Sequence, residues 1–266
     1  MHTDENMTEG DPIESLDLAA LGGFEPELCL KWPRAQMLAH GENSHQRAAV
    51  YGPVADYFKQ CAGPFPGFTA IQDLVAGMFL MGEFEKAAVA VIKQGHIVGV
   101  MVALSVEDAW SQWPAGSRVP EAVVVLNRTV DASFLEQLSV AGARVLLAPG
   151  YTMDAIEWAA QGAPQVSLLE MTQLLRAESL LDIRLLPFGA LVQDRERFSM
   201  SLSAFRLEPG VLIPPCVLED VLFAARCAKH MRSCGVVIAH KETTLAISTG
   251  QLSGRDAWLL ARERAK

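Results

Sequence analysis

An ammonium and an imidazole lie close together in one short stretch of the sequence, Lys93-Gln94-Gly95-His96. A lysine ammonium can stabilise a developing oxyanion, and an imidazole can accept a proton near neutral pH, so both are residue types that could take part in catalysis. Gln94 cannot accept a proton under these conditions. The alternative is a solvated turn, in which Lys93 is a surface lysine and His96 is a polar turn residue.

Gln94 and His96 do not occupy equivalent positions along the chain. Side chains at positions 94 and 96 share one face of an extended strand, but they lie about 6.6 Å apart at roughly 3.3 Å per residue. Gly95 permits a bulge that would change this spacing, but the sequence does not require one.

Cys227, His230 and Cys234 have the spacing i, i+3 and i+7, which places them on one face of a predicted helix. Thiols on an apolar helix face usually pack in a core, so no metal site is predicted. The sequence contains no serine nucleophile elbow, Walker loop or dinucleotide-binding glycine pattern.

Alternating helices and strands are predicted around these residues from the hydrophobic pattern. Apolar runs such as 123–126 indicate strands buried on both faces, as in a parallel sheet covered by helices. The alternation is typical of the α/β class. The predicted strands are 88–92, 97–102, 123–126, 144–148, 165–169, 189–194, 236–239 and 244–247; the predicted helices are 69–84, 105–113, 133–139, 153–160, 218–232 and 253–266.

Composition excludes several classes of function. The 266 residues carry a net charge of −9, without a basic stripe, which disfavours binding to nucleic acid. No apolar stretch approaches the roughly 20 residues that a membrane span needs. Five irregularly spaced cysteines and the absence of an export signal favour a reduced, cytoplasmic protein. The acidic segment 1–25 is predicted to be a mobile tail.

A short sequence pattern occurs twice. Leu104-Ser105-Val106-Glu107-Asp108-Ala109-Trp110 returns as Leu252-Ser253-Gly254-Arg255-Asp256-Ala257-Trp258, each time after a predicted hairpin. The repeat could be a coincidence between two amphipathic helices. The other interpretation is a duplicated hairpin-helix unit.

Eight short motifs resemble, in the same order, the formyltransferase domain of the bifunctional purine-biosynthesis enzyme. They are Gly41-Glu42-Asn43-Ser44-His45-Gln46, Val91-Ile92-Lys93 with Gly99-Val100, Leu126-Asn127-Arg128-Thr129-Val130-Asp131-Ala132, Ala148-Pro149-Gly150-Tyr151, Leu191-Val192-Gln193-Asp194-Arg195, Leu218-Glu219-Asp220-Val221-Leu222-Phe223-Ala224, Ala228-Lys229-His230 and Gly250-Gln251-Leu252-Ser253. That domain formylates the aminoimidazole carboxamide ribonucleotide AICAR with 10-formyltetrahydrofolate.

The resemblance implies a three-layer α/β/α, cytidine-deaminase-like fold with a partial second copy. The expected domains are a first unit at 26–205 and the partial second unit at 206–266. The family works as a homodimer. No cyclohydrolase activity is expected, because residues 1–25 cannot hold that domain. The implied substrate-binding residues are Asn43, His45, Gln46, Gln193, Gln251 and Ser253.

The family's adjacent lysine and histidine correspond to Lys93 and Gln94, so the ammonium is kept and the proton acceptor is lost. Four polar anchors of the family are also replaced, each worth roughly 1 to 3 kcal/mol. Three hypotheses follow: a formyltransferase-like enzyme completed by another subunit, a non-catalytic nucleotide-binding or regulatory relative, and an enzyme with a different substrate. The replaced anchors correspond to Ala39-His40, Ala70, Cys234 and Gly254.

Overall fold

The computed structural model describes residues 24, 26–173, 175, 181–196, 201, 213–231 and 233–266. All of the predicted acidic tail except Phe24 lies outside these residues. Contacts divide the chain into a smaller unit, Met1–Leu30 with Arg176–Arg197, and a larger unit, Lys31–Leu175 with Phe198–Lys266. No helix among the described residues is long and apolar enough to cross a membrane.

The larger unit is built on an eight-stranded mixed sheet with the order β11-β12-β5-β4-β6-β7-β8-β3. Strands β6, β7 and β8 are parallel, and the other neighbours are antiparallel. The α/β prediction is therefore confirmed, with a sheet that is only partly parallel. The strands are β3 (Phe58–Ala62), β4 (Ala87–Lys93), β5 (His96–Ala103), β6 (Val123–Leu126), β7 (Val145–Ala148), β8 (Ser167–Met171), β11 (Val236–His240) and β12 (Thr243–Ser248).

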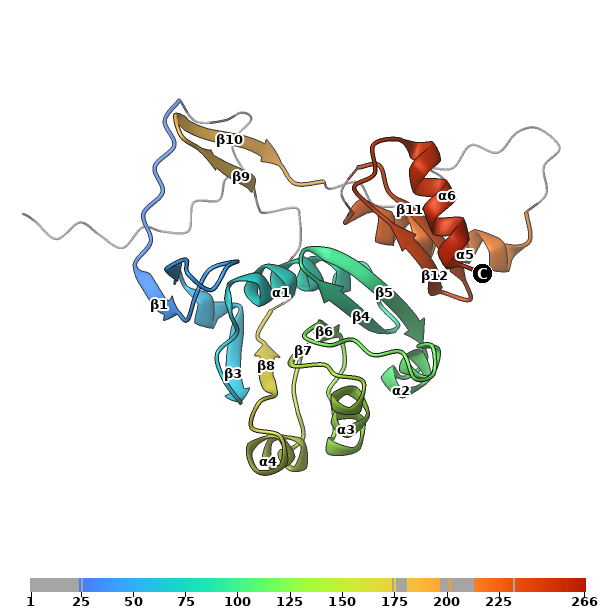
Figure 1. Cartoon of the computed structure of the whole chain (residues 1–266), viewed down its shortest axis with the longest axis horizontal. Coiled ribbons are helices and arrows are strands. Elements are labelled where there is room, and N and C mark those ends of the chain that lie inside the picture. Colours follow the sequence, from blue (N-terminus) through green and yellow to red (C-terminus); the bar gives the residue numbers. More distant parts are fainter. Residues whose placement is uncertain are drawn as a thin grey trace, which may run out of the picture. The chain divides into compact units, whose positions relative to one another are not determined.

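Helices cover both faces of the central strands. Figure 1 shows α1 on one side of these strands and α3 and α4 on the other. Val89 and Val91 of β4 pack in the same buried cluster as Phe134 of α3. Alternate residues of the sheet meet α1, where Gly77 lies against Val125. The helices are α1 (Phe68–Met81), α2 (Val106–Trp110), α3 (Ala132–Val140), α4 (Met153–Gly162), α5 (Pro215–Lys229) and α6 (Gly254–Arg264), with a short 3-10 helix η2 (Val54–Asp56).

All predicted helices and strands are present, with ends that shift by a few residues. Three strands of the larger unit were not predicted: β1 (Arg34–Leu38), β2 (Ala48–Tyr51) and β3. Strands β1 and β2 pair with each other, and β3 forms the edge of the large sheet. Polar residues interrupt the apolar ones in β1 and β3, and Met37 of β1 and Tyr51 of β2 are exposed, so these strands lack the buried apolar runs by which the central strands were predicted.

The described part of the smaller unit contains one antiparallel hairpin. Strand β9 (Leu181–Leu186) pairs with β10 (Gly189–Asp194), and Ile183 lies opposite Val192. The apolar pattern predicts β10 but not β9, because charged residues interrupt the apolar ones in β9.

Two segments of the larger unit have the same order of elements: α1-β4-β5-α2 and α5-β11-β12-α6. Both hairpin turns use left-handed backbone at two successive positions, Gln94-Gly95 and Lys241-Glu242. The helix after each hairpin is capped in the same way: Ser105 accepts from the Asp108 N–H at 3.0 Å, and Ser253 accepts from the Asp256 N–H at 3.1 Å. The repeated sequence pattern thus corresponds to a repeated structure.

The two hairpins meet where β5 runs antiparallel to β12. Strand β5 begins at the Lys93 turn, and β12 therefore ends at the same end of the sheet. Topology thus brings the Lys93 turn and the loop before α6, residues 249–253, to one end of the sheet, while the Lys241-Glu242 turn lies at the other.

Candidate functional site

Lys93 is the last residue of β4 and is half-buried, while Gln94, Gly95 and His96 are exposed. The Lys93 Nζ donates a hydrogen bond to the carbonyl oxygen of Pro120 at 2.8 Å. An ammonium can donate three hydrogen bonds, so this contact leaves capacity for a bound ligand. Lys93 is thus placed by a strand end and anchored by the loop before β6.

Asp73 of α1 supports this turn from inside the protein. Its side chain is only 3% exposed. Its two carboxylate oxygens accept the Gln94 N–H at 2.8 Å and the Gly95 N–H at 2.6 Å. Burial raises the pKa of Asp73, while the two backbone hydrogen bonds and the charge of His96 oppose this change. Sequence reasoning missed Asp73, although an aspartate next to Leu74 on the apolar face of a helix was an available signal.

The predicted residues Asn43, His45 and Gln46 lie in the loop between β1 and β2, and all three are exposed. The Gln46 Oε1 accepts the Asn43 N–H at 2.8 Å, and the Gln46 N–H donates to the Asn43 carbonyl at 3.0 Å. Asn43 and Gln46 therefore stabilise the loop itself. His45 presents its imidazole to solvent.

Gln251 and Ser253 lie in the loop at the same end of the sheet as Lys93. The Ser253 hydroxyl caps α6 and donates to the Asp256 carboxylate at 2.6 Å, while the Gln251 Nε2 donates to the Thr249 carbonyl at 3.2 Å. Gln193 belongs to the smaller unit, where its Nε2 donates to Asp182 at 3.0 Å. Topology thus brings Lys93, Gln94, Gln251 and Ser253 to one end of the sheet.

The motif around Asn127 is structural. Asn127 is almost fully buried; its Oδ1 accepts the Ala88 N–H at 2.8 Å, and its Nδ2 donates to the carbonyls of Phe84 and Lys86. Asp131 caps α3 by accepting the Phe134 N–H at 2.9 Å. These bonds fix the start of β4 against the end of β6, at the opposite end of β4 from Lys93.

No metal cluster marks the Lys93 turn in the described residues. They contain no group of three or more His, Cys, Asp or Glu residues that could hold a metal ion. Burial raises the pKa of the Cys227 thiol, which disfavours the thiolate that a metal would need. An open cavity of about 520 Å³ lies between α2 and α3, where Trp113, Arg118 and Gln137 line it, and it includes none of the predicted site residues.

Comparison with known proteins supports the resemblance found in the sequence. Residues 12–264 match the family model described as the AICARFT/IMPCHase bienzyme. Similar proteins include the bifunctional purine biosynthesis protein PurH of Chloroflexus aurantiacus, with 30% identity over 90% of this chain and 48% of the relative. PurH of Bacteroides thetaiotaomicron is 29% identical over 87% of this chain and 45% of the relative. The chain spans about half the length of these relatives, and it belongs to the AICARFT/IMPCHase bienzyme family.

Proposed function

We propose that this chain is a formyltransferase-like protein that binds the AICAR ribonucleotide of purine biosynthesis at the Lys93 end of the sheet. One observation carries the proposal: in a chain of this family, Lys93 stands at the end of a buried strand, on an exposed turn held by a buried carboxylate. Such a turn presents a fixed cation to a ligand without exposing the sheet.

Two groups at this turn determine the chemistry. The Lys93 ammonium is suited to stabilising the oxyanion that develops when an amine attacks a formyl group. Gln94 can donate a hydrogen bond but cannot remove the amine proton. The residues therefore fit a formyl oxygen but lack the proton acceptor, and we expect transfer to be slower than with a histidine at position 94 by roughly 10²- to 10⁴-fold.

The formyl donor in the proposal is 10-formyltetrahydrofolate, which supplies the formyl group when it is bound. Asn43, His45, Gln46, Gln193, Gln251 and Ser253 are the proposed substrate contacts. We also propose a homodimer and a cytidine-deaminase-like arrangement of the layers; the presence of helices on both faces of the sheet supports the latter.

A second candidate function is nucleotide binding without turnover. It is favoured by the hydrogen bond from Lys93 to Pro120, which already engages the Lys93 ammonium. This candidate predicts binding of AICAR with no release of tetrahydrofolate.

The test combines calorimetric titration with AICAR and a turnover assay with AICAR and 10-formyltetrahydrofolate. We expect binding to the wild type, slow turnover, and a rate increase of about 10²-fold or more in Gln94→His. Lys93→Gln keeps a polar side chain without the charge. Combined with Gln94→His, it should remove the turnover that Gln94→His gains. Binding with no turnover in any variant would favour the second candidate, and absence of AICAR binding would contradict both.

A further inference from the structure

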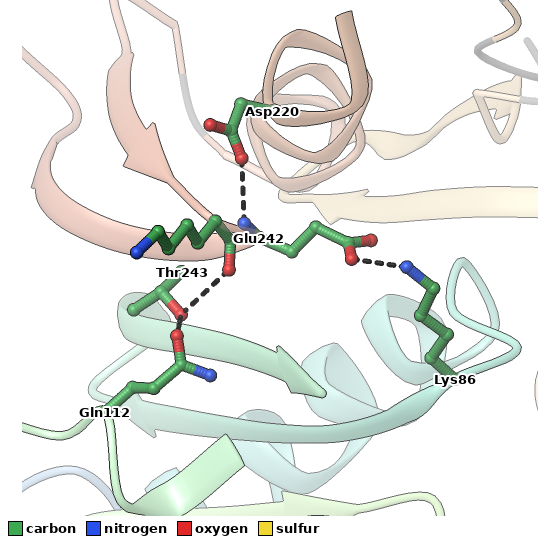
Figure 2. A network of polar contacts seen from close by, with 6 residues as sticks. Lys86, Gln112, Asp220, Glu242 and Thr243 are labelled. Carbon is green, nitrogen blue, oxygen red and sulfur yellow. Dashed lines mark hydrogen bonds and ion pairs between the residues drawn. The ribbon is translucent and has the colours of Figure 1, made fainter. Parts of the chain in front are cut away.

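The two copies of the helix-hairpin unit each contain a carboxylate that holds the hairpin turn. Asp73 of α1 accepts the N–H groups of Gln94 and Gly95, and Asp220 of α5 accepts the Glu242 N–H at 2.8 Å. Figure 2 shows the second of these contacts, with the Asp220 carboxylate directed at the backbone of the Lys241-Glu242 turn. Asp73 and Asp220 are thus structural counterparts.

The turn held by Asp220 is docked onto the first copy. The Glu242 carboxylate pairs with Lys86, and the Thr243 hydroxyl contacts Gln112 (Figure 2). The Glu242 carbonyl also accepts the Val102 N–H of β5 at 3.0 Å. This turn therefore joins the second hairpin to β5, and its polar groups make the contacts that do so.

The turn held by Asp73 is open instead. Gln94, Gly95 and His96 are exposed. Of the side chains of residues 93–96, only that of Lys93 makes a hydrogen bond within the described ranges. Gln94 has φ of 52°, a left-handed conformation that is unfavourable for a residue with a side chain. The open turn lacks the docking contacts of its counterpart, so Gln94 is held in this conformation by the two bonds from Asp73 and by the Lys93–His96 pairing of the hairpin.

We propose that Asp73 is a positioning residue: through the Gln94 and Gly95 amides it sets the turn that places Lys93 and the side chain at position 94 toward the bound nucleotide. This inference rests on the proposed function for its ligand. The inference separates the two carboxylates, because Asp220 holds the corresponding turn through one amide and that turn is not part of the proposed site. The burial that raises the pKa of Asp73 is consistent with a carboxylate kept inside the protein for this purpose.

The experiment compares Asp73→Asn with the matched control Asp220→Asn in the full chain. Amide hydrogen exchange of Gln94 and Gly95 and the dissociation constant for AICAR are measured in both. We expect Asp73→Asn to accelerate exchange at the turn and to weaken AICAR binding, each by about tenfold, whereas Asp220→Asn changes neither. Asp73→Glu keeps a carboxylate, so its amide exchange at the turn and its AICAR affinity should lie between those of the wild type and Asp73→Asn. It serves as the test variant if Asp73→Asn does not fold.

Two outcomes would overturn the inference: unchanged exchange at Gln94 and Gly95 in Asp73→Asn, or equal loss of AICAR affinity in the two asparagine variants. If the wild type does not bind AICAR, the proposed function fails and the role of Asp73 is decided by acetylation with an N-hydroxysuccinimide ester. Asp73→Asn should then raise the acetylation of Lys93 several-fold relative to Lys86, because the ammonium loses its fixed contact with Pro120. An unchanged ratio would contradict the positioning role.

Discussion

The Lys229 Nζ lies 2.8 Å from the Glu83 Oε1, and the two side chains are only 8% and 16% exposed. The His230 Nε2 lies 2.9 Å from the same oxygen. Glu83 follows α1, whereas Lys229 and His230 end α5, so this ion pair joins the two copies of the repeated unit. Asn127, by contrast, bonds only the first copy, at Phe84, Lys86 and Ala88, and Asp131 caps α3.

Glu83→Gln should destabilise the protein at neutral pH. Burial opposes ionisation of Glu83, but the hydrogen bonds from His230 and Lys229 outweigh it and lower the pKa of the carboxyl. The stabilisation is therefore present above the unfolded pKa of about 4.3 and is lost as pH falls through the lower folded pKa. We expect urea unfolding at pH 7 to show a loss of about 2 kcal/mol, because Lys229 remains buried without its partner.

The same measurement at decreasing pH provides the control for the Glu83 prediction. As the pH falls through the lowered pKa the wild-type carboxyl protonates, so the difference between wild type and Glu83→Gln should shrink. A difference that is independent of pH would show that the ion pair does not stabilise the fold.

Gly77→Ala should destabilise the larger unit. A Cβ at Gly77 would lie 2.3 Å from the Val125 Cγ2, so α1 would have to move away from the sheet. Overpacking of this kind typically costs about 1 to 3 kcal/mol. The matched control is Gly254→Ala at the start of α6, where an added Cβ meets nothing within 4 Å. Equal unfolding midpoints for the two variants in urea would contradict the close approach of α1.

Asn127→Ala should reduce stability, whereas Asn43→Ala should not. Removing the buried Asn127 amide leaves the Ala88 N–H and the carbonyls of Phe84 and Lys86 without these partners, at a cost of about 2 kcal/mol. Asn43 is exposed, so its removal should change the free energy of unfolding by less than about 0.5 kcal/mol while weakening AICAR binding. Thermal unfolding and AICAR titration of both variants separate the two roles.

The central strands could be predicted because each carries its own signal. Strand β6 has the predicted bounds, since four consecutive apolar residues are buried on both faces. The edge strand β3, with the sequence Phe-Lys-Gln-Cys-Ala, is defined by its pairing with β8, a long-range contact that its own residues do not encode.

In the candidate site, too, some residues carry a local signal and others are defined only by long-range contacts. Lys93 and Gln94 were found from residue type, turn signal and family motif, all of which are local. Asp73 could not be assigned, because its role depends on the packing of α1 across the sheet, which brings its carboxylate to amides 21 and 22 residues away. For Asn127, the motif marked the residue but not its structural role, which follows from its burial.

Alkylation of the native protein should separate the cysteines by their surroundings. Cys227 is fully buried on α5, and burial raises the pKa of its thiol, so it should resist iodoacetamide at pH 8. Cys29 and Cys216 are exposed and should react within the same period. Peptide mass spectrometry gives the extent of reaction at each site, and alkylation in urea, where all five thiols become accessible, is the control. Rapid native alkylation of Cys227 would mean that α5 does not pack its thiol against the sheet, and the equivalence of α5 with α1 would then be wrong.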